Sequence, residues 1–291
     1  MANQRMAVLG TGTMGQGIAQ LGATSGFDTH VIDVDESRAK AAVSAVVAQL
    51  EKLVAKGKMT DAERTAAVAR LHVAKDVASA CDGVDVVIEA VPEDMALKVA
   101  LFQKVLAASP KEALLGSNTS SLSITELGAK IGAPERTVGL HFFNPPAVME
   151  LLEVVRGLGT SDATVERALE LARTLKKTPI IVNDTPGFAS SRLGVILGAE
   201  AMRMLESGVA SAVDIDRAME LGYRHPMGPL KLTDLVGLDV RLAILDHLTR
   251  EVGEQFRAPP ILRKMVRAGK LGKKTGEGFY VWRDGTPHPK G

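Results

Sequence analysis

Hydrophobic and polar residues alternate with two different periods in the first half of the chain. Short apolar runs lie between longer stretches in which apolar residues recur every three or four positions. The predicted strands cover residues 5–9, 29–34, 84–91, 113–117, 137–143, 151–155 and 179–182. The predicted helices cover residues 14–25, 36–55, 62–71, 96–108 and 161–176. Strands that alternate with helices predict a mostly parallel sheet with helices on both faces.

One crossover in this half is longer than a parallel sheet needs. Residues 36–71 contain two predicted helices, whereas one helix is enough to connect two parallel strands. We therefore expect a helical hairpin that projects from the sheet, with Lys56, Gly57 and Lys58 at its tip.

The pattern changes at the turn-rich segment Asn183-Asp184-Thr185-Pro186-Gly187. Beyond it, residues 188–207, 211–221, 239–252 and 260–268 have helical periodicity, and the next convincing strand is 278–282. We therefore predict an α/β protein of two domains. Residues 1–185 form a Rossmann-type domain with the helical hairpin as an insertion, and residues 186–291 form an all-α domain.

Composition narrows the class of protein. The chain has 291 residues, of which 46% are hydrophobic, enough to bury sizeable cores. A net charge of +1 argues against a protein that coats nucleic acid or an acidic membrane. The single cysteine, Cys81, cannot form an internal disulfide or a cysteine-based zinc site, so no metal is expected. No apolar run approaches 18 residues and no signal-peptide pattern is present, which predicts a cytoplasmic protein.

A glycine-rich turn follows the first predicted strand and opens the first predicted helix. Its sequence is Gly10-Thr11-Gly12-Thr13-Met14-Gly15. The first glycine permits a tight turn, the second lets a pyrophosphate approach the backbone, and the third allows close packing of helix and strand. Asp33 ends the second strand, where a carboxylate binds ribose hydroxyls and repels a 2′-phosphate. This arrangement predicts NAD rather than NADP; the alternative is a glycine-rich turn of an unrelated α/β fold.

Two further segments carry candidate catalytic groups. Ser117-Asn118-Thr119-Ser120-Ser121 follows a predicted strand, at the end of the sheet where α/β folds bind ligands. His141 ends another strand and Glu153 lies in the next one. If these strands are neighbours, the two side chains meet, and an imidazole oriented by a carboxylate is a general base. The alternatives are a packing role for His141 and a helix N-cap role for Ser120.

These segments and four others resemble the short-chain L-3-hydroxyacyl-CoA dehydrogenases, which include bacterial 3-hydroxybutyryl-CoA dehydrogenases, over nearly the whole chain. The matching blocks are GTGTMG (10–15), EAVPED (89–94), SNTSS (117–121), HFFNP (141–145), NDTPGF (183–188), HPMGPLKLTDLVGLD (225–239) and GKKTGEGFY (272–280). The resemblance implies reversible oxidation of a 3-hydroxyacyl-CoA with NAD, in fatty acid metabolism. It also implies a homodimer formed through the C-terminal half, which contributes to the substrate cleft.

The same resemblance assigns individual residues. It implies His141 as the base, Glu153 as its partner, and Ser120 near both the substrate and the nicotinamide. Lys56 falls where the family contacts coenzyme A. The implied NAD contacts are Asp33, Glu93, Lys98, Ser120, Asn144 and Lys274. The alternatives are an exposed helix pair for Glu93 and Lys98 and a solvated side chain for Lys274.

One position departs from the family. The family commonly has PGF-x-x-N-R, whereas this chain has Ser191 at the Asn position. That asparagine makes an accessory polar contact with the substrate, so the change bears on acyl specificity. We expect the hydroxyl of Ser191, or that of Ser190 beside it, to replace the amide.

Two other functions are compatible with parts of this pattern. A dehydrogenase of the same architecture could act on a hydroxy acid without coenzyme A, such as a sugar acid or carnitine. A non-catalytic NAD-binding protein, like a lens crystallin, would need none of Ser120, His141 and Glu153, and the presence of all three argues against it.

Overall fold

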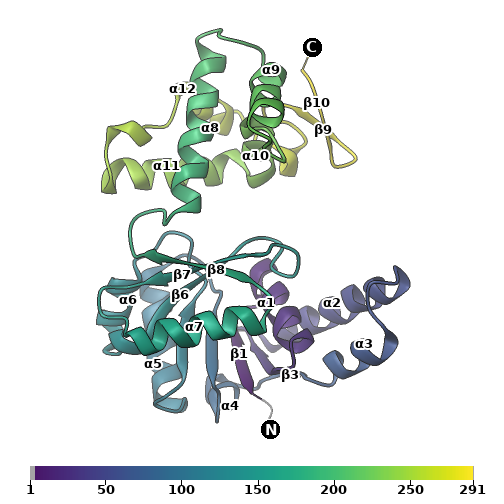
Figure 1. The fold of residues 1–291 in the computed structure, drawn as a ribbon, viewed down its shortest axis with the longest axis vertical. Helices are drawn as coiled ribbons and strands as arrows, with labels where there is room; N and C mark the ends of the chain where they lie inside the picture. Colours follow the sequence, from purple (N-terminus) through teal and green to yellow (C-terminus); the bar gives the residue numbers. More distant parts are fainter. Residues whose placement is uncertain (1–3, 291) are drawn as a thin grey trace. The chain divides into compact units, whose positions relative to one another are not determined.

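A computed structural model describes residues 4–290, and its largest element is an eight-stranded sheet (Figure 1). The strand order is β3-β2-β1-β4-β5-β6-β7-β8, and neighbouring strands are parallel except for β6 and β7. The direction of winding reverses between β1 and β4, and the carboxyl ends of strands at such a point form a ligand crevice. The strands are β1 (Arg5–Leu9), β2 (Asp28–Ile32), β3 (Leu71–Val73), β4 (Val86–Glu89), β5 (Leu114–Ser117), β6 (Thr137–Phe142), β7 (Leu151–Arg156) and β8 (Thr178–Asn183).

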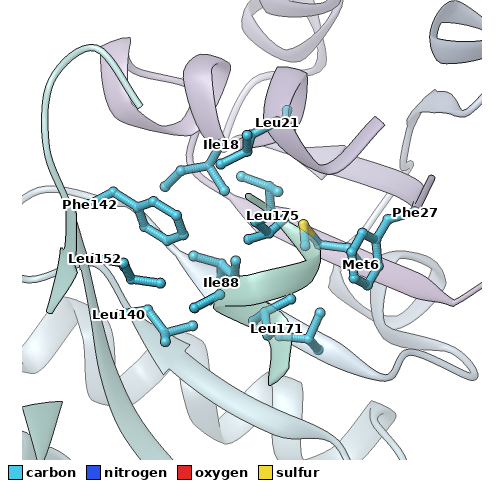
Figure 2. Packing of buried hydrophobic residues seen from close by; sticks show 14 of the residues in the cluster. Met6, Ile18, Leu21, Phe27, Ile88, Leu140, Phe142, Leu152, Leu171 and Leu175 are labelled. Atoms are coloured by element: carbon cyan, nitrogen blue, oxygen red, sulfur yellow. The ribbon is translucent and has the colours of Figure 1, made fainter. Parts of the chain in front are cut away.

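Helices cover both faces of this sheet, as the alternating pattern predicted. Successive residues of a strand point to opposite faces, so Met6 and Val8 join one buried cluster while Ala7 and Leu9 join the other. In the first cluster, side chains of the strands pack against Ile18 and other residues of α1 and against residues of α7 (Figure 2). The helices are α1 (Thr13–Thr24), α2 (Glu36–Ala55), α3 (Asp61–Val68), α4 (Val77–Cys81), α5 (Met95–Ala108), α6 (Ile124–Ile131) and α7 (Asp162–Thr174).

The predicted helical hairpin is formed by α2 and α3. The two helices lie side by side and extend beyond the sheet (Figure 1). Lys56 caps the C-terminus of α2, and Gly57 follows it with a φ of 66°, a conformation that glycine adopts at little cost. Thr60 and Glu63 then form a capping box that starts α3. Lys56 therefore lies at the tip, as the sequence predicted.

The chain divides into two compact units between Thr185 and Pro186. The second unit has its own hydrophobic core, built from helices and from the aromatic residues Phe279, Tyr280 and Trp282. Its elements are α8 (Ser190–Glu206), α9 (Ala212–Arg217), a π-helical turn (Ala218–Gly222), α10 (Pro229–Val236), α11 (Leu238–Glu251), α12 (Pro260–Arg267), β9 (Val281–Arg283) and β10 (Thr286–His288). Short 3₁₀ helices occupy Pro134–Arg136, Glu254–Phe256 and Lys273–Thr275.

The structure corrects the sequence-based prediction at several short elements. The predicted helix 62–71 ends at Val68, and Leu71–Val73 forms strand β3. The second unit is helical but not all-α, because β9 and β10 form a small antiparallel sheet. The pattern also missed α4, α6 and α10, which have five to eight residues each and are too short for a clear helical period. Within residues 4–290, no helix is long and apolar enough to cross a membrane.

Two buried aspartates hold the second unit together. Asp216 accepts hydrogen bonds from the Leu230 and Lys231 amides (2.8 and 3.0 Å), at the start of α10, and from the Tyr280 hydroxyl (2.7 Å). Asp234 accepts from the amides of Phe279 and Tyr280 (2.7 and 2.8 Å) and from Trp282 Nε1 (3.0 Å). These bonds tie the C-terminal segment to the helices. Burial raises the pKa of both carboxyl groups, and the hydrogen bonds that they accept oppose this shift.

We expect Asp234→Ala to destabilise the second unit by at least about 3 kcal/mol, because it leaves three buried donors without an acceptor. Urea unfolding followed by the fluorescence of Trp282, the only tryptophan, measures this directly. Glu251→Ala removes an exposed carboxylate from the same unit and should change stability by less than about 0.5 kcal/mol. Equal effects of the two substitutions would contradict the role given to Asp234.

Candidate active site

The glycine-rich turn between β1 and α1 has the geometry that its three glycines predict. Gly10 has a φ of 94°, and a Cβ there would lie 2.8 Å from the carbonyl oxygen of Ala90. A Cβ on Gly15 would lie 1.9 Å from the carbonyl oxygen of Gly10, so only glycine allows this contact of helix and turn. A Cβ on Gly12 would meet nothing within 4 Å, and no side chain caps α1 there. The N-terminus of α1 is thus open to an anionic ligand.

Asp33 lies directly after β2 and faces this turn. Its carboxylate accepts hydrogen bonds from the amide and hydroxyl of Thr11 (2.8 and 2.7 Å) and from the amide of Val34 (2.9 Å). Burial opposes ionisation, but these bonds and the nearby Arg38 outweigh it and lower the pKa of Asp33. The group is therefore an anion at neutral pH, and it is held in position to accept hydrogen bonds from hydroxyl groups.

A cavity of about 620 Å³ lies over the glycine turn and Asp33. Its remaining walls are mostly apolar and come from the segment after β4 and from α5, with Arg38 and Lys104 as cations. The combination of an open helix N-terminus, a fixed carboxylate and apolar walls fits a dinucleotide with its pyrophosphate, ribose and base. Arg38 was not singled out from the sequence, where it is one of many charged residues of a helix.

Lys98 is not the exposed helix residue that one interpretation of the sequence proposed. It is 1% exposed, and its ammonium group lies 2.6 Å from Glu89 Oε1 and 3.3 Å from Glu93 Oε2. Glu89 is fully buried and also accepts from the Val91 amide (2.7 Å) and the Ser117 hydroxyl (2.6 Å). Glu89 was not singled out from the sequence, although an acidic residue at the end of an apolar strand is a signal of a buried, partnered carboxylate. The pair joins the carboxyl ends of β4 and β5 to α5.

Glu93 connects this pair to the segment after β5. It accepts hydrogen bonds from the amide and hydroxyl of Ser120 (2.7 and 3.1 Å) and from the hydroxyl of Thr119 (3.0 Å). Ser120 is not a helix N-cap, because α6 begins at Ile124 and its cap is Ser123. The capping alternative for Ser120 is therefore wrong, and its position is set by Glu93.

His141 and Glu153 face each other across the antiparallel pair β6 and β7. They are direct partners in the strand register, so both side chains lie on the same face of the sheet. Nδ1 of His141 lies 2.6 Å from Oε2 of Glu153, which is fully buried, while His141 is 7% exposed. A carboxylate on Nδ1 favours the tautomer with the proton on that nitrogen and stabilises the imidazolium. The amide of Phe142 donates to Asn118 Oδ1 (3.0 Å), which ties the end of β6 to the Ser120 segment.

The other predicted residues belong to other segments of the chain. Asn144 lies just beyond β6 with an exposed side chain, and Lys56 is at the tip of the hairpin. Ser191 and Lys274 belong to the second unit. Ser191 is half-buried in the first turn of α8. The ammonium group of Lys274 lies 2.6 Å from Asp239, so this side chain is ion-paired rather than simply solvated.

Comparison with known proteins gives the family. Residues 5–185 match "3-hydroxyacyl-CoA dehydrogenase, NAD binding domain", and residues 187–282 match "3-hydroxyacyl-CoA dehydrogenase, C-terminal domain". The cofactor that fits the cavity is accordingly NAD.

Individual relatives cover almost the whole chain. A probable 3-hydroxybutyryl-CoA dehydrogenase of Bacillus subtilis is 42% identical, over 98% of this chain and 100% of the relative. A 3-hydroxyadipyl-CoA dehydrogenase of Escherichia coli is 41% identical, over 96% of this chain and 59% of that longer protein. The solved structure of (S)-3-hydroxybutyryl-CoA dehydrogenase from Ralstonia eutropha superimposes with a TM-score of 0.93 at 38% identity, covering 97% of this chain and 100% of the other. The chain belongs to the 3-hydroxyacyl-CoA dehydrogenase family.

Proposed function

We propose that this protein catalyses the reversible, NAD-dependent oxidation of (S)-3-hydroxyacyl-CoA to 3-oxoacyl-CoA, with short acyl groups such as 3-hydroxybutyryl. The observation that carries the proposal is the buried His141–Glu153 pair, which lies in the same unit as the NAD cavity. An acid–base group beside a nicotinamide site is what alcohol oxidation by hydride transfer requires.

In the proposed mechanism, His141 removes the proton from the 3-hydroxyl group. Bound NAD supplies the chemistry of accepting the hydride from C3. Glu153 holds the imidazole in one tautomer and compensates the positive charge that His141 acquires, and it can do so because its carboxylate is 2.6 Å away and fully buried. In the reverse direction, the imidazolium returns the proton to the ketone oxygen.

Ser120 is the proposed second substrate contact. Its hydroxyl and amide are both held by Glu93, which supports a fixed orientation toward the substrate oxygen. Because Lys98 is buried against Glu89 and Glu93, its contribution to the cofactor site goes through Glu93. The amides of the turn that includes Thr13 and Met14 bind the pyrophosphate, and Asn144 and Lys274 are further proposed cofactor contacts.

The two ends of the substrate are assigned to different units of the chain. Lys56, at the tip of the hairpin, is the proposed contact for a coenzyme A phosphate, since it is exposed and positively charged. Ser191, in the first turn of α8, is the proposed polar contact near the acyl group. The names of the relatives include both hydroxybutyryl and hydroxyadipyl esters, so the acyl end is where members of the family differ.

A homodimer through the second unit is also proposed. The large apolar residues of this unit differ in exposure. Val195 and Leu245 are buried in the core, whereas Leu193, Leu235 and Val236 are exposed. Leu193 lies in α8, and Leu235 and Val236 lie in α10. Exposed apolar side chains on these two helices favour a contact between copies of the chain.

The proposed location is the cytoplasm. Cys81, the single cysteine, is a buried free thiol, and burial raises its pKa to about 11, so it is largely unreactive. A protein that relies on no disulfide suits a reducing compartment.

Oxidation of NADH in the presence of acetoacetyl-CoA tests the reaction. Free acetoacetate and gulonate-type substrates, measured beside it, test the alternative in which the substrate lacks coenzyme A. A protein that binds NADH but oxidises it with none of these substrates would be the non-catalytic alternative.

We expect NAD to be preferred over NADP by at least about tenfold in kcat/KM, which corresponds to about 1.4 kcal/mol, because the Asp33 carboxylate repels a 2′-phosphate. Asp33→Ala should reduce this preference, whereas Glu36→Gln, an exposed acid at the start of α2, should leave it unchanged. Equal use of both cofactors by the unmodified protein would rule out the role assigned to Asp33.

We expect His141→Ala to lower kcat by roughly 10²–10⁴, which is the usual contribution of a positioned acid–base group. Glu153→Gln should also lower kcat, because the amide cannot compensate the imidazolium. Binding of NADH should remain near that of the unmodified protein, and His288→Ala, at an exposed histidine of β10, serves as the control. Retention of most of the kcat by His141→Ala would refute the mechanism.

We expect light scattering at micromolar protein to give twice the mass of one chain. Leu235→Asp should shift the protein toward the monomer, because it places a charge in the apolar contact. Leu158→Asp changes a leucine of the first unit that is 91% exposed and should leave the mass unchanged. A monomeric unmodified protein would count against the dimer.

A further inference from the structure

Four polar residues lie on one face of the sheet, toward the amino ends of β1, β2 and β3. Arg5 is the register partner of Asp28, and His30 is the register partner of His72 on the edge strand β3. Asp28 and His30 are two positions apart in β2, so their side chains point to the same face. All four side chains therefore converge, and none of them lines the NAD cavity.

Three of these side chains present metal-binding atoms to one another. Oδ1 of Asp28 lies 2.6 Å from Nε2 of His72, and Oδ2 of Asp28 lies 3.0 Å from Nε2 of His30. The centroids of the two imidazole rings are 4.9 Å apart, and one ligand atom from each of the three residues lies within 4.8 Å of the others. In a tetrahedral zinc site with bonds of about 2.0–2.1 Å, the donor atoms are about 3.3 Å apart. Small rotations of the side chains therefore bring all three onto one ion.

The contacts of His30 point to a cation between this residue and Asp28. Nε2 of His30 lies 2.8 Å from Nη2 of Arg5, and a guanidinium can only donate, so the nitrogen carries its lone pair in that contact. The same nitrogen then has no proton for Asp28, and two acceptor atoms face each other 3.0 Å apart. A metal ion between them relieves the repulsion, because it accepts an electron pair from each. Arg5 can release His30 and stay anchored, since its Nη1 donates to the carbonyl oxygen of Asp82 (2.5 Å).

The types of ligand atom select the kind of ion. Two imidazoles and one carboxylate suit zinc and the neighbouring first-row divalent ions, whereas magnesium and calcium prefer oxygen ligands alone. The side chains of His30, Asp28 and His72 are 16, 28 and 44% exposed, so an ion can enter from solvent and keep water as a fourth ligand. The expectation that the chain holds no metal rested on Cys81 alone, since a local pattern does not bring His30 and His72 together.

We infer that Asp28, His30 and His72 form a binding site for a first-row divalent metal ion, with Zn²⁺ as the best fit. The ion links β2 to β3, an edge strand of only three residues whose backbone ladder is short, so a bond through side chains adds to its hold on the sheet. The five residues of β2, roughly 16 Å of strand, separate this site from Asp33, which faces the cofactor cavity. The ion therefore stabilises the edge of the sheet and takes no part in hydride transfer.

The first experiment is a calorimetric titration of Zn²⁺ into the full chain without an affinity tag. The unmodified protein should bind one ion, and His72→Gln and Asp28→Asn should each bind it at least about tenfold more weakly, because even loss of a group that only orients a ligand costs 10–100-fold in affinity. His288→Gln, at an exposed histidine outside the cluster, should bind as the unmodified protein does. His72 is itself exposed, so its replacement leaves the fold intact. No binding, or equal affinity of the unmodified protein and His72→Gln, would overturn the inference.

The second experiment measures thermal stability. Zn²⁺ at about 100 times its Kd should raise the Tm of the unmodified protein by at least about 3 °C, because the ion binds the folded state alone. His72→Gln should show at most about half of this rise at the same ion concentration, since its affinity is at least about tenfold lower. A chelator should reverse the rise, and Mg²⁺ should not reproduce it. A rise of equal size in His72→Gln, or with Mg²⁺, would overturn the inference.

The third measurement separates this site from the other pair of imidazole and carboxylate, His141 and Glu153. His141→Ala should bind Zn²⁺ as the unmodified protein does, and saturation with Zn²⁺ should leave the binding of NADH unchanged. Weaker binding of Zn²⁺ by His141→Ala, or loss of NADH binding as the ion binds, would place the ion in the active site and overturn the inference. None of these measurements requires turnover, so their outcome is independent of the proposed function.

Discussion

The antiparallel pairing of β6 with β7 is the constraint on which the proposed chemistry depends. All other neighbours in the sheet are parallel, and in a parallel arrangement residues 141 and 153 could not be direct register partners across so short a connection. The reversal of direction places Glu153 opposite His141 on one face of the sheet, with their side chains 2.6 Å apart. The full burial of Glu153 makes the pairing strong, because little water competes for the carboxylate.

Two carboxylates, the buried Glu89 and the exposed Glu93, also organise the ends of the strands around this pair. Glu89 binds Lys98 and Ser117, while Glu93 binds Ser120 and thereby links the segments after β4 and β5. These segments have little regular structure, so side-chain hydrogen bonds replace the backbone ladder that fixes a strand. Removal of the Glu89 carboxylate would leave the buried donors of Lys98 and Ser117 unsatisfied, so this part of the network holds together as a unit.

The second unit shows both kinds of buried polar group. Asp216 and Asp234 are completely satisfied by amides, a hydroxyl and an indole, and they serve the fold by tying the C-terminal segment to the helices. Arg241 and Thr233 are equally buried but lack partners within residues 4–290. The first pair stabilises the folded state, whereas burial of the second without partners costs stability.

The sequence by itself determined the long elements, the turn at Gly10–Gly15, the acid after β2 and the change of pattern near Thr185, because each of these is a local property of neighbouring residues. It also named His141 and Glu153, but their meeting depended on which strands are neighbours. Only the tertiary structure decided that Lys98 is buried, that Ser123 rather than Ser120 caps α6, and that Leu71–Val73 is a strand. Only the tertiary structure, too, showed that Arg241 lies among leucines without a partner. The physical reason is that burial and pairing are set by contacts between residues far apart in the chain, which a local pattern does not contain.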